Sequence, residues 1–159
     1  CVGQPACLGR SPTSWWRDPA SPAIAVTGAV MSAPTCARCG RAMTPRKNWD
    51  RQQEPVKYCS KQCRTRRIRP VDRMLEAAIV ALLSERSAAA SICPSEAARR
   101  VKPEGWEMLM EPCRMAARRL VAQGCAEITQ NKRVVDPSTA KGPIRVRRGP
   151  QFRPASNDG

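Results

Sequence analysis

Residues 36–40 read Cys36-Ala37-Arg38-Cys39-Gly40, and residues 59–63 read Cys59-Ser60-Lys61-Gln62-Cys63. Two residues between the cysteines of the first pair let the chain fold back, so that both sulfurs reach one tetrahedral ion. The second pair is spaced i and i+4, which puts both sulfurs on one face of a helical turn. The 19 residues between the pairs suffice for a hairpin. The pattern therefore predicts a small metal-stabilised finger.

The cysteines also limit the choice of metal. The chain has no histidine, so the complete ligand set that it offers is Cys36, Cys39, Cys59 and Cys63. Four thiolates at this spacing favour structural Zn2+ in a closed site over an iron–sulfur cluster or free cysteines. A module of about 35 residues buries too little surface to fold alone, so zinc is expected to supply much of its folding free energy.

This part of the chain resembles a bacterial family, domain of unknown function 2256. The resemblance rests on three segments, residues 36–41, 43–49 and 56–64, and covers residues 36–67. It implies a zinc finger and brings no known activity.

Positive charge is concentrated around the finger. The chain has 28 basic and 13 acidic residues, a net charge of +15, and residues 36–70 hold 11 basic against 2 acidic. Such a balance is typical of chains that contact phosphate backbones or anionic surfaces. The densest cluster is Arg64, Arg66, Arg67 and Arg69.

After Pro70 the hydrophobic pattern predicts three helices followed by a β-hairpin. The expected helices span residues 72–86, 94–101 and 112–123. The expected strands span residues 91–93, 126–130 and 134–135, with a tight turn at Asn131-Lys132. Residues 144–147 are expected to form another strand or a basic arm. This is the winged-helix order, in which the third helix commonly enters a major groove and the wing touches phosphate. The predicted fold class is therefore small α+β, a four-cysteine zinc finger followed by a three-helix winged-helix-like domain.

The third predicted helix has one apolar stripe, which includes Cys113, Ala116 and Leu120. Its periodicity leaves Arg118 and Arg119 outward, with Arg114 on the flank. The second half of the chain is also similar to domain of unknown function 3253, a family that occurs fused behind such a finger. That similarity rests on segments within 92–99, 110–117, 128–130 and 134–145, and spans residues 72–147.

These patterns divide the chain into four parts. Residues 1–30 are rich in Pro, Ser, Gly and Ala and are expected to be a disordered or non-native extension, with Met31 as the natural start. The finger with its basic arm occupies residues 31–69 and the winged-helix-like domain residues 70–148. A disordered tail is expected over residues 149–159.

We interpret the protein as a non-catalytic, cytoplasmic nucleic-acid-binding protein, since it lacks histidine, an acid–base pair and a membrane-length apolar run. Whether the ligand is DNA or RNA stays open. The expected nucleic-acid-binding residues are Arg64, Arg66, Arg67, Arg69, Arg114, Arg118, Arg119, Lys132 and Arg133. The alternative is a protein-interaction adaptor that uses the finger and the winged helix as docking surfaces.

Overall fold

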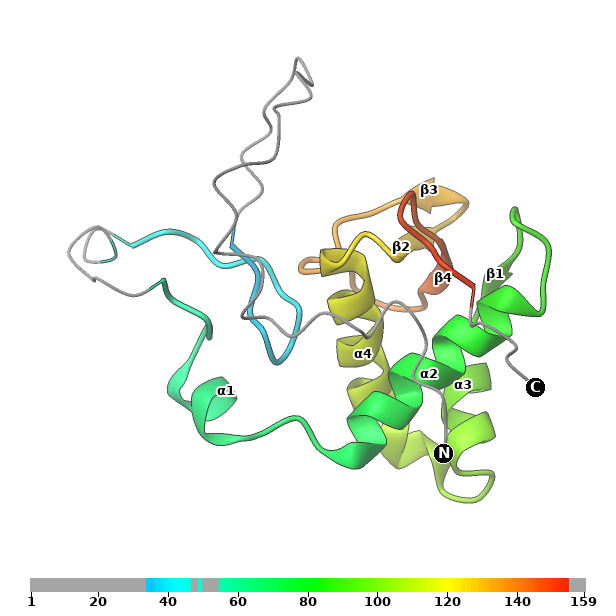
Figure 1. Ribbon diagram of the computed structural model, residues 1–159, viewed down its shortest axis with the longest axis horizontal. Coiled ribbons are helices and arrows are strands. Elements are labelled where there is room, and N and C mark those ends of the chain that lie inside the picture. The colour runs from blue at the N-terminus through cyan, green and yellow to red at the C-terminus, as the bar shows by residue number, and fades with distance from the viewer. Residues whose placement is uncertain (1–33, 47–48, 50–54, 155–159) are drawn as a thin grey trace, which may run out of the picture.

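The computed structural model describes residues 34–46, 49 and 55–154, and these form two regions that contact each other (Figure 1). We call residues 34–63 the cysteine-rich segment, residues 64–69 the basic arm and residues 70–154 the α+β domain. Helix α1 (Lys61–Thr65) lies where the cysteine-rich segment meets the arm. The expected extension over residues 1–30, with its proposed start at Met31, lies outside the described residues.

The α+β domain contains three helices and a four-stranded sheet. In chain order its elements are α2 (Pro70–Ser84), β1 (Ser91–Ile92), α3 (Pro94–Val101), the 3-10 helix η3 (Trp106–Leu109), α4 (Met110–Ala122), β2 (Ala126–Gln130), β3 (Arg133–Val134) and β4 (Arg145–Arg148). The prediction of a small α+β fold is therefore confirmed.

Two of the helices begin at prolines. Helix α3 begins at Pro94 as predicted, and the Glu96 side chain accepts a hydrogen bond from the Cys93 amide over 2.7 Å. Helix α2 begins at Pro70, two residues before the predicted start. Proline suits the first helical position because its missing N–H would have no partner there. Asp72 then lies inside the first turn and accepts from the Arg69 amide over 2.8 Å.

Helix α4 begins at Met110, directly after η3, and so starts two residues before the predicted Pro112. Pro112 is tolerated because it lies in the first turn, where backbone N–H groups have no partner within the helix. The sequence-based placement of Pro112 as the first residue was therefore wrong by half a turn.

The sheet is antiparallel, with strand order β1-β4-β2-β3. Strands β2 and β3 form the predicted hairpin, in which Gln130 pairs with Arg133 and both turn residues, Asn131 and Lys132, have positive φ. Strand β4 then inserts between β1 and β2, so that Val146 lies opposite Ile128 and Ile92. The segment predicted as a strand or an arm is thus a central strand.

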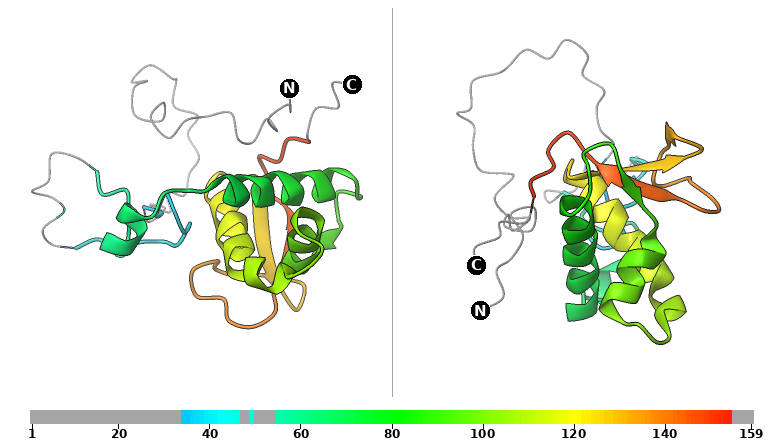
Figure 2. Two further views of the ribbon diagram at one scale, coloured as in Figure 1. Left: turned by 90° about the horizontal axis from the view of Figure 1, so that it is seen from below. Right: turned by 90° about the vertical axis from the view of Figure 1, so that its right-hand side faces the viewer.

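The three helices pack on one side of the sheet, as the right-hand view of Figure 2 shows. The core between these layers is aliphatic. Its largest fully buried side chains are Leu75, Ile79, Leu83, Ile92, Leu120, Ile128, Val80 and Val146. The few aromatic residues contribute at the margin, where Trp106 and Phe152 are partly buried against this core.

The chain after β4 is held against the domain, so the prediction of a tail disordered from Gly149 onward is wrong for its first residues. The Gly149 amide donates to Cys125 O and the Gln151 amide donates to Gly124 O, each over 3.0 Å. Residues 155–159 lie outside the described part. Among the described helices, none is long and apolar enough to span a membrane.

Candidate metal centre and the surfaces beside it

The first cysteine pair lies on a tight turn closed by backbone hydrogen bonds. The Gly40 amide donates to Cys36 O over 2.8 Å, and the Cys36 amide donates to Arg41 O over 2.9 Å. Gly40 has φ +68°, a left-handed conformation that glycine adopts without a steric penalty. This turn brings the sulfurs of Cys36 and Cys39 together.

The second pair is placed by the start of helix α1. Ser60 caps this helix, because its side-chain oxygen accepts a hydrogen bond from the Cys63 amide over 3.2 Å. Cys59 precedes the cap and Cys63 lies within the helix. The Ala37 amide donates to Lys57 O over 2.9 Å, which ties the first turn to the segment leading into the second pair.

The four sulfurs meet with the spacing of a tetrahedral site. The Sγ atoms of Cys36, Cys39, Cys59 and Cys63 all lie within 4.8 Å of one another. The Cys39–Cys59 sulfur distance is 3.7 Å and the Cys59–Cys63 distance is 3.5 Å. Four metal–sulfur bonds of about 2.3 Å give tetrahedral edges of roughly 3.8 Å. The donor set therefore fits a single metal ion, and the prediction that these cysteines form a candidate metal site is confirmed.

The ionisation of these thiols differs from one to the next. Burial raises the pKa of Cys36, but hydrogen bonds from the backbone N–H groups of Cys39, Cys59 and Arg38 outweigh it and lower that pKa to about 7. Burial raises the pKa of Cys39. Burial and the neighbouring thiols raise the pKa of Cys59 to about 12. Four thiolates at this spacing need a cation among them to offset their repulsion.

Apolar side chains surround the cysteines, and one of them comes from the α+β domain. Trp49 and Val56 pack on this cluster together with Met115, which lies on α4. Trp49 is thus a packing residue. Tyr58 differs from it, because Tyr58 is 37% exposed and lies outside the cluster.

The cysteine turn packs directly on helix α4. A Cβ atom added to Gly40 would lie 2.5 Å from the carbonyl carbon of Arg118, 2.6 Å from the Cβ of Arg118 and 2.6 Å from the amide nitrogen of Arg119. These separations are far shorter than van der Waals contact. Only glycine therefore fits here, both for its φ and for the close approach of the two backbones.

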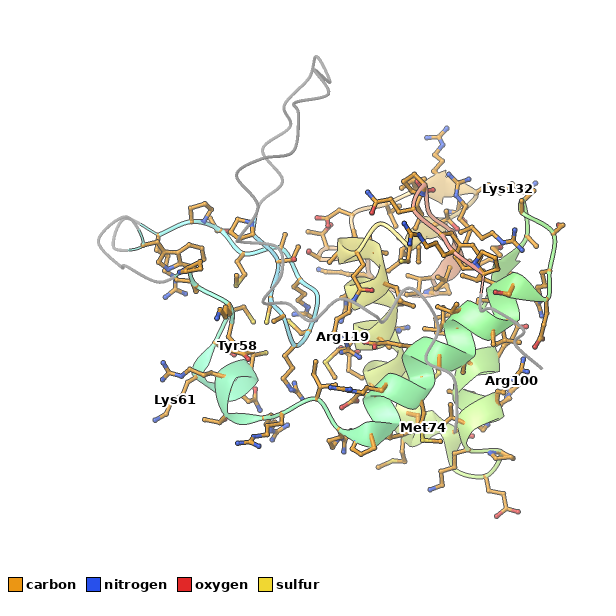
Figure 3. All side chains as sticks on the ribbon, viewed as in Figure 1. Tyr58, Lys61, Met74, Arg100, Arg119 and Lys132 are labelled. Carbon is orange, nitrogen blue, oxygen red and sulfur yellow. The ribbon has the colours of Figure 1, made fainter. Side chains whose placement is uncertain are left out.

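Arg119 joins three parts of the chain at this contact. Its Nε forms an ion pair with the buried carboxylate of Glu76 on α2. Its Nη1 donates to Arg38 O over 2.8 Å, and its Nη2 donates to Asp72 O over 3.4 Å. Figure 3 shows Arg119 where α4, α2 and the cysteine-rich segment meet. Burial raises the pKa of Glu76, and the guanidinium of Arg119 opposes this change.

The prediction that Arg118 and Arg119 face outward is therefore wrong. Each residue is only 6% exposed. Arg118 donates to Pro137 O over 3.1 Å and to the Glu111 carboxylate over 3.1 Å. Both side chains serve the packing of the α+β domain and its contact with the cysteine turn, so they are unavailable to a groove. The cysteine turn covers the part of α4 that carries Arg118 and Arg119.

The basic arm keeps its predicted exposure. Arg64, Arg66 and Arg67 are exposed, and no ion pair to them is found within residues 34–46, 49 and 55–154. Arg69 is also exposed, but its Nε pairs with the carboxylate of Asp72 over 3.4 Å. The arm therefore presents three unpaired guanidinium groups next to the candidate metal centre.

The remaining predicted basic residues lie farther away. Lys132 and Arg133 are exposed at the β2–β3 turn, which Figure 3 shows at the opposite end of the molecule from Lys61. Arg114 is half-buried and donates to Gly142 O over 3.2 Å. The predicted basic residues thus form no single surface.

Sequence reasoning missed the contact between the two regions. One signal was available, because Glu76 lies on the same helical face as Leu75, Ile79 and Leu83, where a carboxylate needs a buried partner. The close approach of Gly40 to α4 joins residues far apart in the chain, so no local sequence pattern indicates it.

Comparison with known families gives two matches. Residues 30–66 match the family model described as "Uncharacterized protein conserved in bacteria (DUF2256)", and residues 72–149 match that described as "Protein of unknown function (DUF3253)". The search of curated proteins found no match. The boundary between the two matches falls in the basic arm and the first turn of α2. The chain thus joins a DUF2256 segment to a DUF3253 segment in that order, as the sequence resemblances predicted.

Proposed function

We propose that this protein binds zinc through the four clustered cysteines, Cys36, Cys39, Cys59 and Cys63, and binds nucleic acid through the basic arm. The observation that carries the second part is the exposure of Arg64, Arg66 and Arg67, whose guanidinium groups form no ion pair within residues 34–46, 49 and 55–154. Arginine forms bidentate hydrogen bonds to phosphate, and neutralising phosphates releases counterions from the nucleic acid. The net charge of +15 favours association with a polyanion.

Zinc is the metal that fits the donor set best. All four donors are thiolates, the sulfur spacing is that of a tetrahedral ion, and the chain has no histidine. Zinc prefers this arrangement and stays redox-inactive in it. With four protein ligands the site leaves no position for a reacting water, which supports a binding role rather than a catalytic one.

For the α+β domain we propose a variant winged helix. The order of α2, β1, α3, α4 and the β2–β3 hairpin supports this assignment. The variant differs in using β4 as the central strand and in packing the cysteine turn over α4. Phosphate contacts would therefore come from the arm, with Lys132 and Arg133 at the wing as a separate contact, and not from insertion of α4.

The test is fluorescence anisotropy of the zinc-loaded full chain with oligonucleotides across a salt series. The slope of log K against log salt is negative, and each lost phosphate contact reduces its magnitude by about 0.9 for duplex DNA. We expect the triple variant Arg64→Gln/Arg66→Gln/Arg67→Gln to flatten this slope by roughly 2 to 3.

A matched control removes the same charge elsewhere. Arg99, Arg100 and Lys102 belong to α3 and its C-terminal cap, and Figure 3 shows Arg100 far from Lys61. If this control triple flattens the slope as much as the arm triple, net charge alone drives binding and the arm has no special role. If the unmodified chain binds no nucleic acid at low salt, the proposal is wrong. Association that is insensitive to salt and nuclease would instead favour protein docking.

A further inference from the structure

A pocket lies beside the cysteine-rich segment, on the chain that leads into α1. Its volume is about 420 Å3, within the roughly 300–1,000 Å3 typical of small-ligand sites. The residues that line it are Pro55, Val56, Lys57, Tyr58, Ser60, Lys61 and Arg64. The pocket is separate from the four sulfurs, and Arg64 is the one lining residue that takes part in the zinc or nucleic-acid binding proposed above.

The lining combines positive charge with a flat ring. Lys57, Lys61 and Arg64 are all exposed, and none of the described residues that line the pocket is acidic. No ion pair engages these three cations within the part of the chain that the structure describes. Figure 3 shows Tyr58 and Lys61 on the side of the cysteine-rich segment that faces away from the α+β domain. The site therefore suits a ligand with a planar group next to negative charge.

Tyr58 is free to meet such a planar group. Its side chain is 37% exposed and is not part of the apolar cluster around the cysteines, whereas the neighbouring Val56 is. An aromatic ring held open beside cations is the arrangement by which proteins bind unpaired bases, since every base has a face that stacks. Val56 and Pro55 supply apolar surface next to the ring.

The pocket is built on backbone that is held in place. Lys57 O accepts the hydrogen bond from the Ala37 amide, which ties this segment to the first cysteine turn. The Arg64 amide donates to Ser60 O over 3.1 Å within α1. Tyr58 itself immediately precedes the candidate ligand Cys59. Because this backbone is already held in place, the protein loses less conformational entropy when a ligand binds.

We propose that this pocket holds one unpaired nucleotide of a single-stranded nucleic acid, with its base stacked on Tyr58 and its flanking phosphates contacted by Lys57, Lys61 and Arg64. This rests on the proposed nucleic-acid binding and names the form of nucleic acid that the site selects. A base inside a duplex is paired and stacked and does not reach the ring, whereas an unpaired base does. The basic arm continues from Arg64 and follows the backbone of the same strand.

The experiment uses the zinc-loaded full chain with two probes, fluorescein-labelled oligo(dT) of 15 nucleotides and the same strand annealed to oligo(dA). Stacking of one base on an aromatic ring gives roughly 5- to 150-fold in affinity. We expect Tyr58→Leu to weaken binding of the single strand by that factor and to leave binding of the duplex unchanged. The matched variant Tyr58→Phe keeps the ring and should bind both probes as the unmodified chain does.

A direct readout is available because the chain contains a single tyrosine. Incorporation of 3-fluorotyrosine gives one 19F resonance from Tyr58, and we expect it to shift on addition of oligo(dT) and not on addition of the duplex. Equal zinc content and equal circular dichroism of the variants serve as the check on folding.

The outcomes separate this inference from the function on which it rests. If the unmodified chain binds neither probe, nucleic-acid binding itself fails. If it binds both but Tyr58→Leu leaves single-strand affinity unchanged and the fluorine resonance does not move, the pocket proposal is overturned while the arm proposal stands. Stacking on this ring is also overturned if Tyr58→Phe weakens single-strand binding as much as Tyr58→Leu does. The same holds if Tyr58→Leu weakens binding of the single strand and of the duplex equally.

Discussion

Gly40 offers the sharpest test of the contact between the cysteine turn and α4. Replacing it by alanine has two separable effects. The first is backbone strain, because φ +68° costs a residue with a Cβ about 1–2 kcal/mol. The second is a clash, because the added Cβ meets the backbone of α4 at 2.5–2.6 Å, and backbone atoms cannot rotate away. Overpacking of this kind typically costs about 1–3 kcal/mol.

Gly105 supplies a matched control. It has the same φ of +68°, but a Cβ there would meet nothing closer than Lys102 Nζ at 3.6 Å, which is ordinary contact with a mobile side chain. We therefore expect Gly105→Ala to lower the free energy of unfolding by about 1–2 kcal/mol and Gly40→Ala by about 2–5 kcal/mol. Gly40→Asn should have less backbone strain than either alanine variant, because asparagine tolerates the left-handed region, but it should keep the clash with α4.

Two measurements on the zinc-loaded chain decide the outcome. Urea unfolding gives the difference between the Gly40 and Gly105 variants. Hydrogen exchange of the Ala42 amide reports on the contact itself, because this amide donates to the Ser138 hydroxyl across the interface over 2.7 Å. Exchange should accelerate in Gly40→Ala alone, with zinc content unchanged. Equal stabilities within about 0.5 kcal/mol and equal exchange in the two variants would refute the packing of the turn on α4.

Three further predictions concern single side chains. Cys63→Ser should abolish stoichiometric zinc binding, because it removes one of the four candidate ligands. Cys93→Ser should retain zinc binding, because Cys93 lies at a helix start where serine is favoured. Elemental analysis of the two variants measures their zinc content. Glu76→Gln should cost about 3–5 kcal/mol in urea unfolding, because it leaves the buried Arg119 without its carboxylate; a loss below 1 kcal/mol would contradict a buried pair. Burial raises the pKa of Cys113 to about 12, so this thiol should stay protonated at pH 8 and resist iodoacetamide until the chain is denatured, as mass spectrometry would show.

Local patterns in the sequence were sufficient for most of the α+β domain. Pro94 and Glu96 mark the start of α3, and Asn131-Lys132 marks the hairpin turn, because these signals depend on residues close in the chain. The cysteine spacing was likewise enough to identify the candidate metal site. Helix boundaries were off by two residues at Pro70 and Pro112, where a proline inside the first turn is compatible with more than one start.

The second buried face of α4 could not be predicted from local sequence patterns. Periodicity identifies one apolar stripe, and Arg118 and Arg119 fall outside it, so they were assigned to solvent. The structure buries them through ion pairs and backbone carbonyls, and all of these partners except Glu111 lie outside α4. A charged face that is buried by polar contacts leaves no hydrophobic signal. The position of β4 between β1 and β2 is nonlocal in the same sense.

The Arg119 contacts have a consequence for the basic arm that lies between the two regions. The arm leaves the cysteine-rich segment at α1 and enters the α+β domain at α2, and Arg119 ties both regions together through Arg38 O and Asp72 O. The arm is therefore a closed loop whose ends are anchored at a set separation, and not a free linker. A loop anchored at both ends has already lost much of its chain entropy, so the guanidinium groups that it carries are held in a prearranged row for the phosphate backbone that we propose they bind.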